Sequence, residues 1–243
     1  MEYGNLLANS FKEVLSNFIA YTIATVIAFF GSILFITAPP LLYGYIMMLT
    51  KGARNEIVNG MDILDGFRNG NFVRSWKYML FMMIIGVVIM IAAIILLIIG
   101  GIIGFAIIYA AGSALPESAS IAIMVLIYLV VLCIVLIPAF FMMYLLPLYV
   151  IKGYEITEAL SESIQLVKEN IITSVIISLI AGLVALVGSL PYYAGFFLGW
   201  PIYFNLLIYI IGILITIPLS QQILVNTTLE LGSFPELIGE SDE

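Results

Sequence analysis

Long apolar stretches without any charged side chain alternate along this chain with short polar segments. Four runs contain no Asp, Glu, Lys or Arg, at residues 14–50, 78–116, 118–151 and 171–229. A helix that crosses the hydrocarbon core of a bilayer needs about 20 predominantly apolar residues, and every run exceeds that length. The pattern predicts an all-α membrane protein, a polytopic bundle of transmembrane helices.

Breaks inside the apolar runs set the number of predicted spans. Pro191 and Pro201 divide 171–229, and Ala38-Pro39-Pro40 divides 14–50, because proline suits the first turn of a helix. The stretch 100–114 is expected to be an apolar connector. We expect a single domain, 1–229, with six transmembrane helices in three hairpins, followed by an acidic cytoplasmic tail, 230–243. The predicted spans are 12–36, 39–56, 76–100, 119–151, 168–190 and 201–227.

The basic residues indicate the orientation. With six spans, all eight Lys and Arg fall on the same side, which the positive-inside rule assigns to the cytoplasm. A count of five spans would place Lys12 outside. Both termini are therefore expected in the cytoplasm, with the protein in the cell membrane. Because the first residues are acidic and amphipathic, unlike a secretory leader, the first span is expected to stay as an uncleaved anchor.

Two segments share a switch from polar to apolar sequence. Residues 10–28 and 163–181, aligned without gaps, match at seven positions, which include Ser10 with Ser163 and Asn17 with Asn170. An amphipathic stretch precedes each asparagine, and an apolar stretch follows it. We expect a cytoplasmic amphipathic helix that lies on the membrane surface and leads into a span at the asparagine. A third polar segment, 59–79, precedes the third predicted span.

Several short motifs resemble a known family. They are the glycine and aromatic helix "PLLYGYIMMLTKG", the turn Asp65-Gly66-Phe67, and the helix that holds Ala159, Leu160, Ser163, Lys168 and Asn170. Together they resemble a group of uncharacterised bacterial and archaeal six-span membrane proteins of unknown function. That group is related to the membrane domain that accompanies some glycerophosphodiester phosphodiesterases, and the resemblance implies topology rather than an activity. We expect no soluble phosphodiesterase domain in this chain.

Few side chains offer catalytic or metal-binding chemistry. Histidine, the commonest general base and metal ligand, is absent, and the single cysteine, Cys133, is expected to fill space in the core. Oxygen ligands from clustered carboxylates hold divalent metals in some proteins, but helix caps and solvated faces explain these clusters as well. The clustered carboxylates are Asp62, Asp65, Glu155, Glu158 and Glu162. We predict no catalytic, cofactor-binding or metal-binding residue, and no cofactor.

The apolar centres of the predicted spans hold no ionisable residue of the kind that ion-coupled transporters carry. Gln221, Gln222, Asn226 and Thr227 either line a polar notch at the cytoplasmic end of the last span or bond between helices. The glycines at 100–104 are expected to pack helices, and Gly195 with Gly199 fits a turn or packing equally well. An outer aromatic belt accounts for Tyr192, Tyr193, Phe196, Phe197, Trp200 and Tyr203.

These features favour a protein that acts through packing. We expect a non-enzymatic scaffold, complex subunit or organiser of lipid. The alternative is a facilitator of neutral or amphiphilic, lipid-like substrates, and an intramembrane enzyme is a third reading. The expected partners are membrane lipids and a second copy or another membrane subunit. The net acidic cytoplasmic face argues against nucleic acid, which binds basic surfaces.

Overall fold

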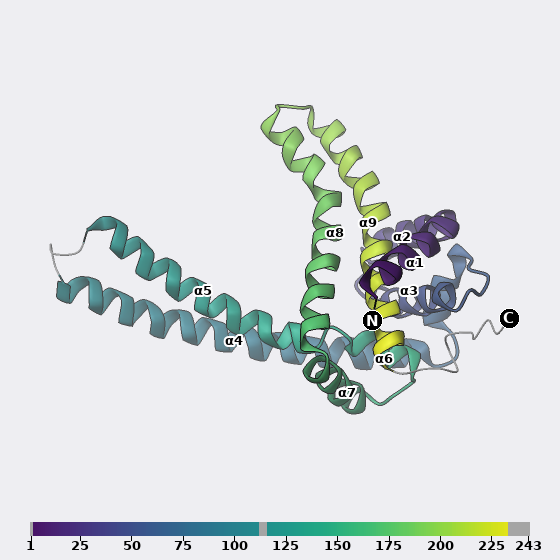
Figure 1. Cartoon of the computed structure of the whole chain (residues 1–243), viewed down its shortest axis with the longest axis horizontal. Coiled ribbons are helices and arrows are strands. Elements are labelled where there is room, and N and C mark those ends of the chain that lie inside the picture. The colour runs from purple at the N-terminus through teal and green to yellow at the C-terminus, as the bar shows by residue number, and fades with distance from the viewer. Residues whose placement is uncertain (1, 112–115, 233–243) are drawn as a thin grey trace. The chain divides into compact units, whose positions relative to one another are not determined.

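The computed structural model of the chain describes residues 2–111 and 116–232, which are mostly helical and contain no β-strand. The elements are α1 (Tyr3–Ser16), α2 (Phe18–Gly31), α3 (Ala38–Ala53), the 3-10 helix η1 (Gly60–Phe67), α4 (Asn71–Ala111), α5 (Glu117–Phe141), α6 (Leu145–Ile151), α7 (Ile156–Glu169), α8 (Ile171–Phe197) and α9 (Ile202–Leu231) (Figure 1). The predicted all-α class is confirmed. Of the predicted acidic tail, residues 233–243 lie outside the described residues.

The chain divides into two compact units. The first comprises Met1–Tyr78 and Met143–Glu243, and the second comprises Met79–Met142. The first unit therefore contains α1 to α3, η1, the first two turns of α4, and α6 to α9. The second unit contains the rest of α4 together with α5.

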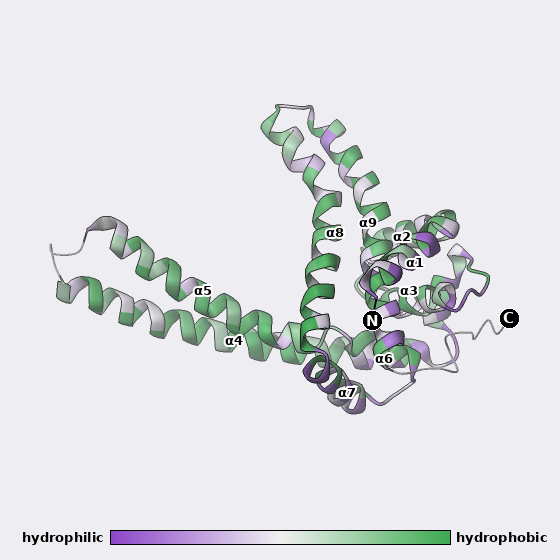
Figure 2. Cartoon of the chain, in the orientation of Figure 1, coloured by the Kyte–Doolittle hydropathy of each residue, from purple (hydrophilic) through white to green (hydrophobic). Residues whose placement is uncertain are grey.

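Four stretches are long and apolar enough to cross a membrane: Asn71–Ala111, Ser118–Ile151, Ile171–Phe197 and Ile202–Leu231. Hydrophobic colours dominate these helices in Figure 2, whereas α7 is largely hydrophilic. A fifth span results only if α1 and α2, bent by 80° at their break, count as one. The six-span count is not confirmed. The 14 residues of α2 and the 16 of α3 extend only about 21 and 24 Å, less than a hydrocarbon core of about 30 Å.

The second unit is a helical hairpin. A Cβ atom added at Gly100 or Gly104 would meet the side chain of Ile127 on α5, so these glycines allow close helix packing, as predicted. The expected connector at 100–114 is wrong up to Ala111, because α4 continues to that residue; 112–114 lie outside the described residues. A continuous helix pairs every backbone group internally, which an apolar environment requires.

Cys133 does not fill a core as expected. Its side chain is exposed on α5. The helix packs along one side of α4, so most of its other apolar side chains are exposed as well.

The first unit contains a second hairpin, α8 with α9. A Cβ atom at Gly212 would strike the backbone of Gly188, and one at Gly188 would strike Thr216, so the two backbones touch. The predicted connector is shorter than expected, because α8 continues past Pro191 to Phe197. Of the two glycines left open, Gly195 packs against Asn205 and Trp200, whereas Gly199 has a φ of +69° in the turn.

Both predicted switches from polar to apolar sequence coincide with helix breaks. α1 and α7 each have 14 residues and each ends at an asparagine, Asn17 or Asn170. Each asparagine side chain donates back to a carbonyl four residues earlier, Glu13 O and Leu166 O respectively, at 3.1 Å. Ser10 and Ser163 are both fully buried. The two halves of the internal repeat therefore fold alike up to the break.

η1 lies against α3 with almost no side chain between them. A Cβ atom at Gly44 would overlap the carbonyl of Ile63, and one at Gly66 would overlap the carbonyl of Pro40. Ile63 itself is completely buried beside Ile46, Met48 and Leu49. The close contact depends on two glycines that face each other.

Gly44→Ala and Gly66→Ala are expected to destabilise the protein, because the added methyl group meets rigid backbone. Overpacking of this kind costs about 1–3 kcal/mol, which lowers the melting temperature of a chain this size by several degrees. Thermal unfolding of the purified protein in detergent measures the change. Gly182→Ala is the control, since nothing lies within 4 Å of its added Cβ. Equal melting temperatures for all three variants would contradict the packing described.

Candidate functional site

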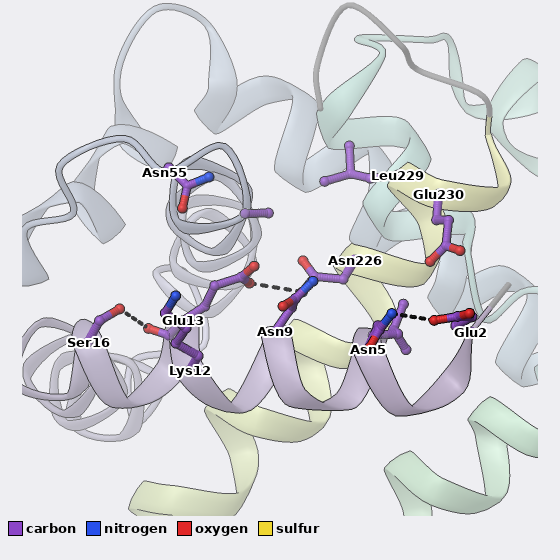
Figure 3. A pocket seen from close by; sticks show the side chains of 12 residues that line it. Glu2, Asn5, Asn9, Lys12, Glu13, Ser16, Asn55, Asn226, Leu229 and Glu230 are labelled. Carbon is purple, nitrogen blue, oxygen red and sulfur yellow. Dashed lines mark hydrogen bonds between the residues drawn. The ribbon is translucent and has the colours of Figure 1, made fainter. Parts of the chain in front are cut away.

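A groove of about 740 Å³ opens between α1, the last turns of α9 and the end of α3 (Figure 3). α1 contributes most of its polar face, and polar side chains of α9 and of Asn55, just after α3, also line the groove. The residues that line it are Glu2, Asn5, Leu6, Asn9, Lys12, Glu13, Ser16, Ala53, Asn55, Asn226, Leu229 and Glu230.

Asn226 links α9 to α1 at the inner side of this groove. Its Nδ2 donates to Ser10 Oγ and to Glu13 Oε2, each at 2.9 Å. Its Oδ1 accepts from Gln222 Nε2 at 3.0 Å. Because Ser10 is fully buried and Asn226 is half-buried, these bonds form at the base of the groove and fix the position of α1.

Gln222 continues the network toward α2 and α3. Its Nε2 also donates to Leu49 O at 3.2 Å, and its Oε1 accepts from the Tyr21 hydroxyl at 3.1 Å. Both Gln222 and Tyr21 are fully buried. The side chain of Gln222 therefore connects α9 with both α2 and α3.

The structure combines the two readings of the polar residues near the end of α9. Asn226 lines the groove, as the notch reading predicts. Gln222 and Thr227 are buried and hydrogen-bonded instead, with Thr227 Oγ1 donating to Ile223 O at 2.7 Å. Gln221 is half-buried. Part of the predicted notch is thus a surface and part is an interhelical contact.

Glu13 supplies the carboxyl group of this network, as the acceptor for Asn226. Burial raises the pKa of its carboxyl, and the side-chain amides of Asn226 and Gln222 partly oppose this by bonding to the charged form. Glu2 and Glu230 lie in the same groove with one base, Lys12. The groove is therefore net acidic and suited to cationic or hydrogen-bonding groups rather than to anions.

Asp62, Asp65 and Glu162, three of the five clustered carboxylates, pair with lysines. Lys51 Nζ lies 3.4 Å from Asp62 and 3.2 Å from Asp65, and Lys152 Nζ lies 3.1 Å from Glu162. Asp62 and Glu158 also complete capping boxes at the start of η1 and α7. Within 2–111 and 116–232, no group of three or more His, Cys, Asp or Glu is placed to hold a metal ion. The capping role expected for Asp62 is confirmed.

Sequence reasoning missed the role of these lysines and of Arg74. Each lysine precedes a glycine at the end of a helix, in Lys51-Gly52 and Lys152-Gly153, and each is followed by the acid that it binds. This repeated pattern is visible in the sequence. Arg74 gives no such signal: it lies over the Tyr149 ring at 4.7 Å and donates to three carbonyls of residues distant in sequence.

Comparison with known proteins identifies one family. A family model described as Domain of unknown function (DUF7847) matches residues 5–231. No curated protein and no solved structure matches the chain.

Glu13→Gln is expected to flatten the dependence of stability on pH. The pKa of Glu13 is raised above its ordinary value of 4.5, so in the window above 4.5 the folded protein binds more protons than the unfolded chain. The free energy of unfolding therefore falls as pH rises through this window. Glutamine keeps an oxygen that accepts from Asn226 and never ionises, so the variant should equal or exceed the wild type in stability at neutral pH.

The measurement is chemical unfolding of the protein in detergent between about pH 5 and 8. Glu13→Leu is the matched control, because it removes the charge and the acceptor together and leaves Asn226 without that bond. It should be less stable than Glu13→Gln at every pH. A pH profile that Glu13→Gln leaves unchanged would show that Glu13 does not titrate in this range.

Proposed function

Because the chain belongs to this DUF7847 family, whose domain has no assigned function, we propose from its own residues that it is a non-enzymatic membrane protein. In this proposal it acts as a scaffold, a subunit of a membrane complex or an organiser of the surrounding lipid. It lies in the cell membrane with both termini in the cytoplasm, and it does not bind nucleic acid. Its partners are membrane lipids and a second copy or another membrane protein.

The packing of α8 against α9 carries this proposal. Gly188 and Gly212 bring the two backbones into contact, and Ser220 Oγ donates across the pair to Ala181 O at 3.1 Å. Thr216 Oγ1 bonds within its own helix, to Gly212 O at 3.0 Å. The seam between the helices is therefore closely packed, and the hydroxyl groups of Ser220 and Thr216 are satisfied inside the protein.

The outer face of the same hairpin has the opposite character. Leu179, Leu183, Leu186 and Leu190 recur at helical spacing on α8, and each is more than half exposed. Side chains at this spacing form one face of a helix. A filled seam together with a regular apolar outer face supports a protein that acts through contacts with lipid or with other helices.

The resemblance to uncharacterised prokaryotic membrane proteins fits this proposal, and with it we propose a prokaryotic origin and a distant relation to the membrane domain that accompanies some glycerophosphodiester phosphodiesterases. The motif residues make structural contacts. Gly66 packs on Pro40, Asp65 binds Lys51, and Asn170 ends α7. These roles support a shared architecture rather than a shared reaction.

The mass of the protein in native nanodiscs tests the scaffold proposal. Extraction with its surrounding lipid should give a stoichiometric complex, either of several copies or with a second subunit. Leu183→Trp on α8 and Ile211→Trp on α9 alter two exposed positions of the same hairpin. If the partner binds one face of the hairpin, only one of the two variants should lose the complex. A monomer without a partner in every lipid mixture would contradict the proposal.

The groove favours a second candidate, a facilitator of lipid-like substrates. Its polar lining at the end of a predicted span suits the cationic or hydrogen-bonding groups of a lipid headgroup, and Asn226 lies at its base. The purified protein should then move fluorescent phospholipid across proteoliposome membranes, and Asn226→Leu should abolish this movement. Ser189→Ala, on the exposed side of α8, is the control and should move lipid like the wild type. Flux equal to that of empty vesicles would eliminate this candidate.

A further inference from the structure

The connection between α2 and α3 forms an apolar tip. Six large side chains in this region are each more than half exposed. They are Phe29, Phe30, Ile33, Leu34, Phe35 and Ile36. No charged residue occurs between residues 14 and 50, so the tip has no ionic group of its own to hold it in water. Side chains of this kind need an apolar environment.

Trp76 shows where this tip lies. Its Nε1 donates to Ile36 O at 3.2 Å, and its ring packs edge-on against Phe35 with 5.7 Å between centroids. Trp76 belongs to the second turn of α4, and Lys77 follows it as the last charge before the apolar run that begins at residue 78. The tip therefore contacts α4 on the polar side of the point where α4 becomes apolar.

The contacts of Arg74 also place this end of α4 among polar segments of the chain. It precedes Trp76 by two residues and donates to Tyr149 O, Gly153 O and Tyr154 O at 2.9–3.1 Å. Gly153 and Tyr154 belong to the polar connection between α6 and α7. The tip of the hairpin is thus within one helical turn of a charged residue bound to that connection.

The other end of the hairpin lies on the same side. Lys51, near the end of α3, binds Asp62 and Asp65 of η1, and Tyr21 near the start of α2 binds Gln222 of α9. The α9 residues that pack against this part of the unit are Leu219, Gln222, Val225 and Leu229, all in the second half of the helix. A pair of helices that crossed the bilayer beside α9 would be expected to contact its first half as well.

From these contacts we propose that α2 and α3 do not cross the membrane but lie along its cytoplasmic boundary, with the tip, residues 29–36, inserted among the acyl chains of the adjoining leaflet. Four helices then cross, and the lengths of α2 and α3, too short for a hydrocarbon core of about 30 Å, become appropriate. A helix in the plane of the interface buries its apolar face about 5–10 Å deep. This inference does not depend on the proposed function.

The four-span arrangement satisfies the positive-inside rule as well as six spans do. Residues 1–77 contain six of the eight basic residues, and all of these stay on one side if α1 to α3 do not cross. Lys152 and Lys168 follow the second span and return to that side. The charge pattern that led to six spans therefore fits both the four-span and the six-span arrangement. The contacts of Trp76 and Arg74 favour four spans.

Lipid rather than a partner protein is the occupant that the surroundings of the tip favour. The tip lies level with the start of an apolar span, and Ile19 and Ile23 extend its exposed apolar surface along α2. Interfacial tryptophans such as Trp76 mark the headgroup level in membrane proteins. The same bilayer that surrounds the adjoining span therefore reaches the tip.

Single cysteines in a Cys133→Ser background test the proposal in the full chain. Ser32→Cys marks the exposed tip, Glu56→Cys marks the polar loop after α3, and Ser118→Cys marks the start of α5. Cells that express each variant are treated from outside with a membrane-impermeant maleimide. We expect Ser118→Cys to react, Glu56→Cys to react only after permeabilisation, and Ser32→Cys not to react from outside. Reaction of Ser32→Cys from outside would show that the hairpin crosses.

Spin labels at the same positions test the lipid contact. The purified variants are placed in vesicles of phosphatidylethanolamine and phosphatidylglycerol, where dissolved oxygen concentrates in the acyl chains and a nickel chelate stays in water. Oxygen should accelerate the relaxation of the spin label at Ser32→Cys, and the nickel chelate should accelerate that of the label at Glu56→Cys. Relaxation by nickel at Ser32→Cys would place the tip in water, and protection from both reagents would show that another protein surface covers it. Either result would overturn the proposal.

Discussion

The structure of the first unit depends on one buried amide. Gln222 lies in the last third of α9 and bonds to Tyr21 on α2, to Leu49 on α3 and to Asn226, which in turn holds α1. A buried amide without partners costs several kilocalories per mole, of the order of 2–7 kcal/mol. Any arrangement that separated these helices would leave Gln222 unpaired, so the helices around it have little freedom to shift.

The groove follows from the same network. Asn226 reaches outward from α9 to Ser10 and Glu13, and it thereby sets α1 beside the end of α9 with its polar face toward the groove. Because Glu13 is held half-buried, the pKa of its carboxyl rises. The groove therefore has hydrogen-bonding side chains at its bottom and acidic side chains around its opening. The interaction that stabilises the unit is also the one that shapes its candidate binding surface.

Glycine contacts play the corresponding part elsewhere. Gly44 and Gly66 bring η1 onto α3, Gly188 and Gly212 join α8 to α9, and Gly100 lets α5 approach α4. Where the backbones touch in this way, little space remains between helices, and the apolar side chains are directed outward. A protein built in this manner presents its chemistry on its outer faces and at its polar ends, which is why both the proposed function and the apolar tip concern surfaces.

The sequence by itself determined the helical class, the stretches long and apolar enough to cross a membrane and the breaks at Asn17 and Asn170, because these follow from local patterns of apolar and polar residues. It also indicated two packing glycines, Gly100 and Gly104, whereas Gly101 between them meets no neighbour. It did not determine the number of spans, since positive-inside counting fits four or six, nor the partners of Gln222, Lys51 and Arg74. Those depend on residues far apart in the chain, and only the tertiary structure, which sets Trp76 against Ile36, decides at which level the α2–α3 hairpin lies.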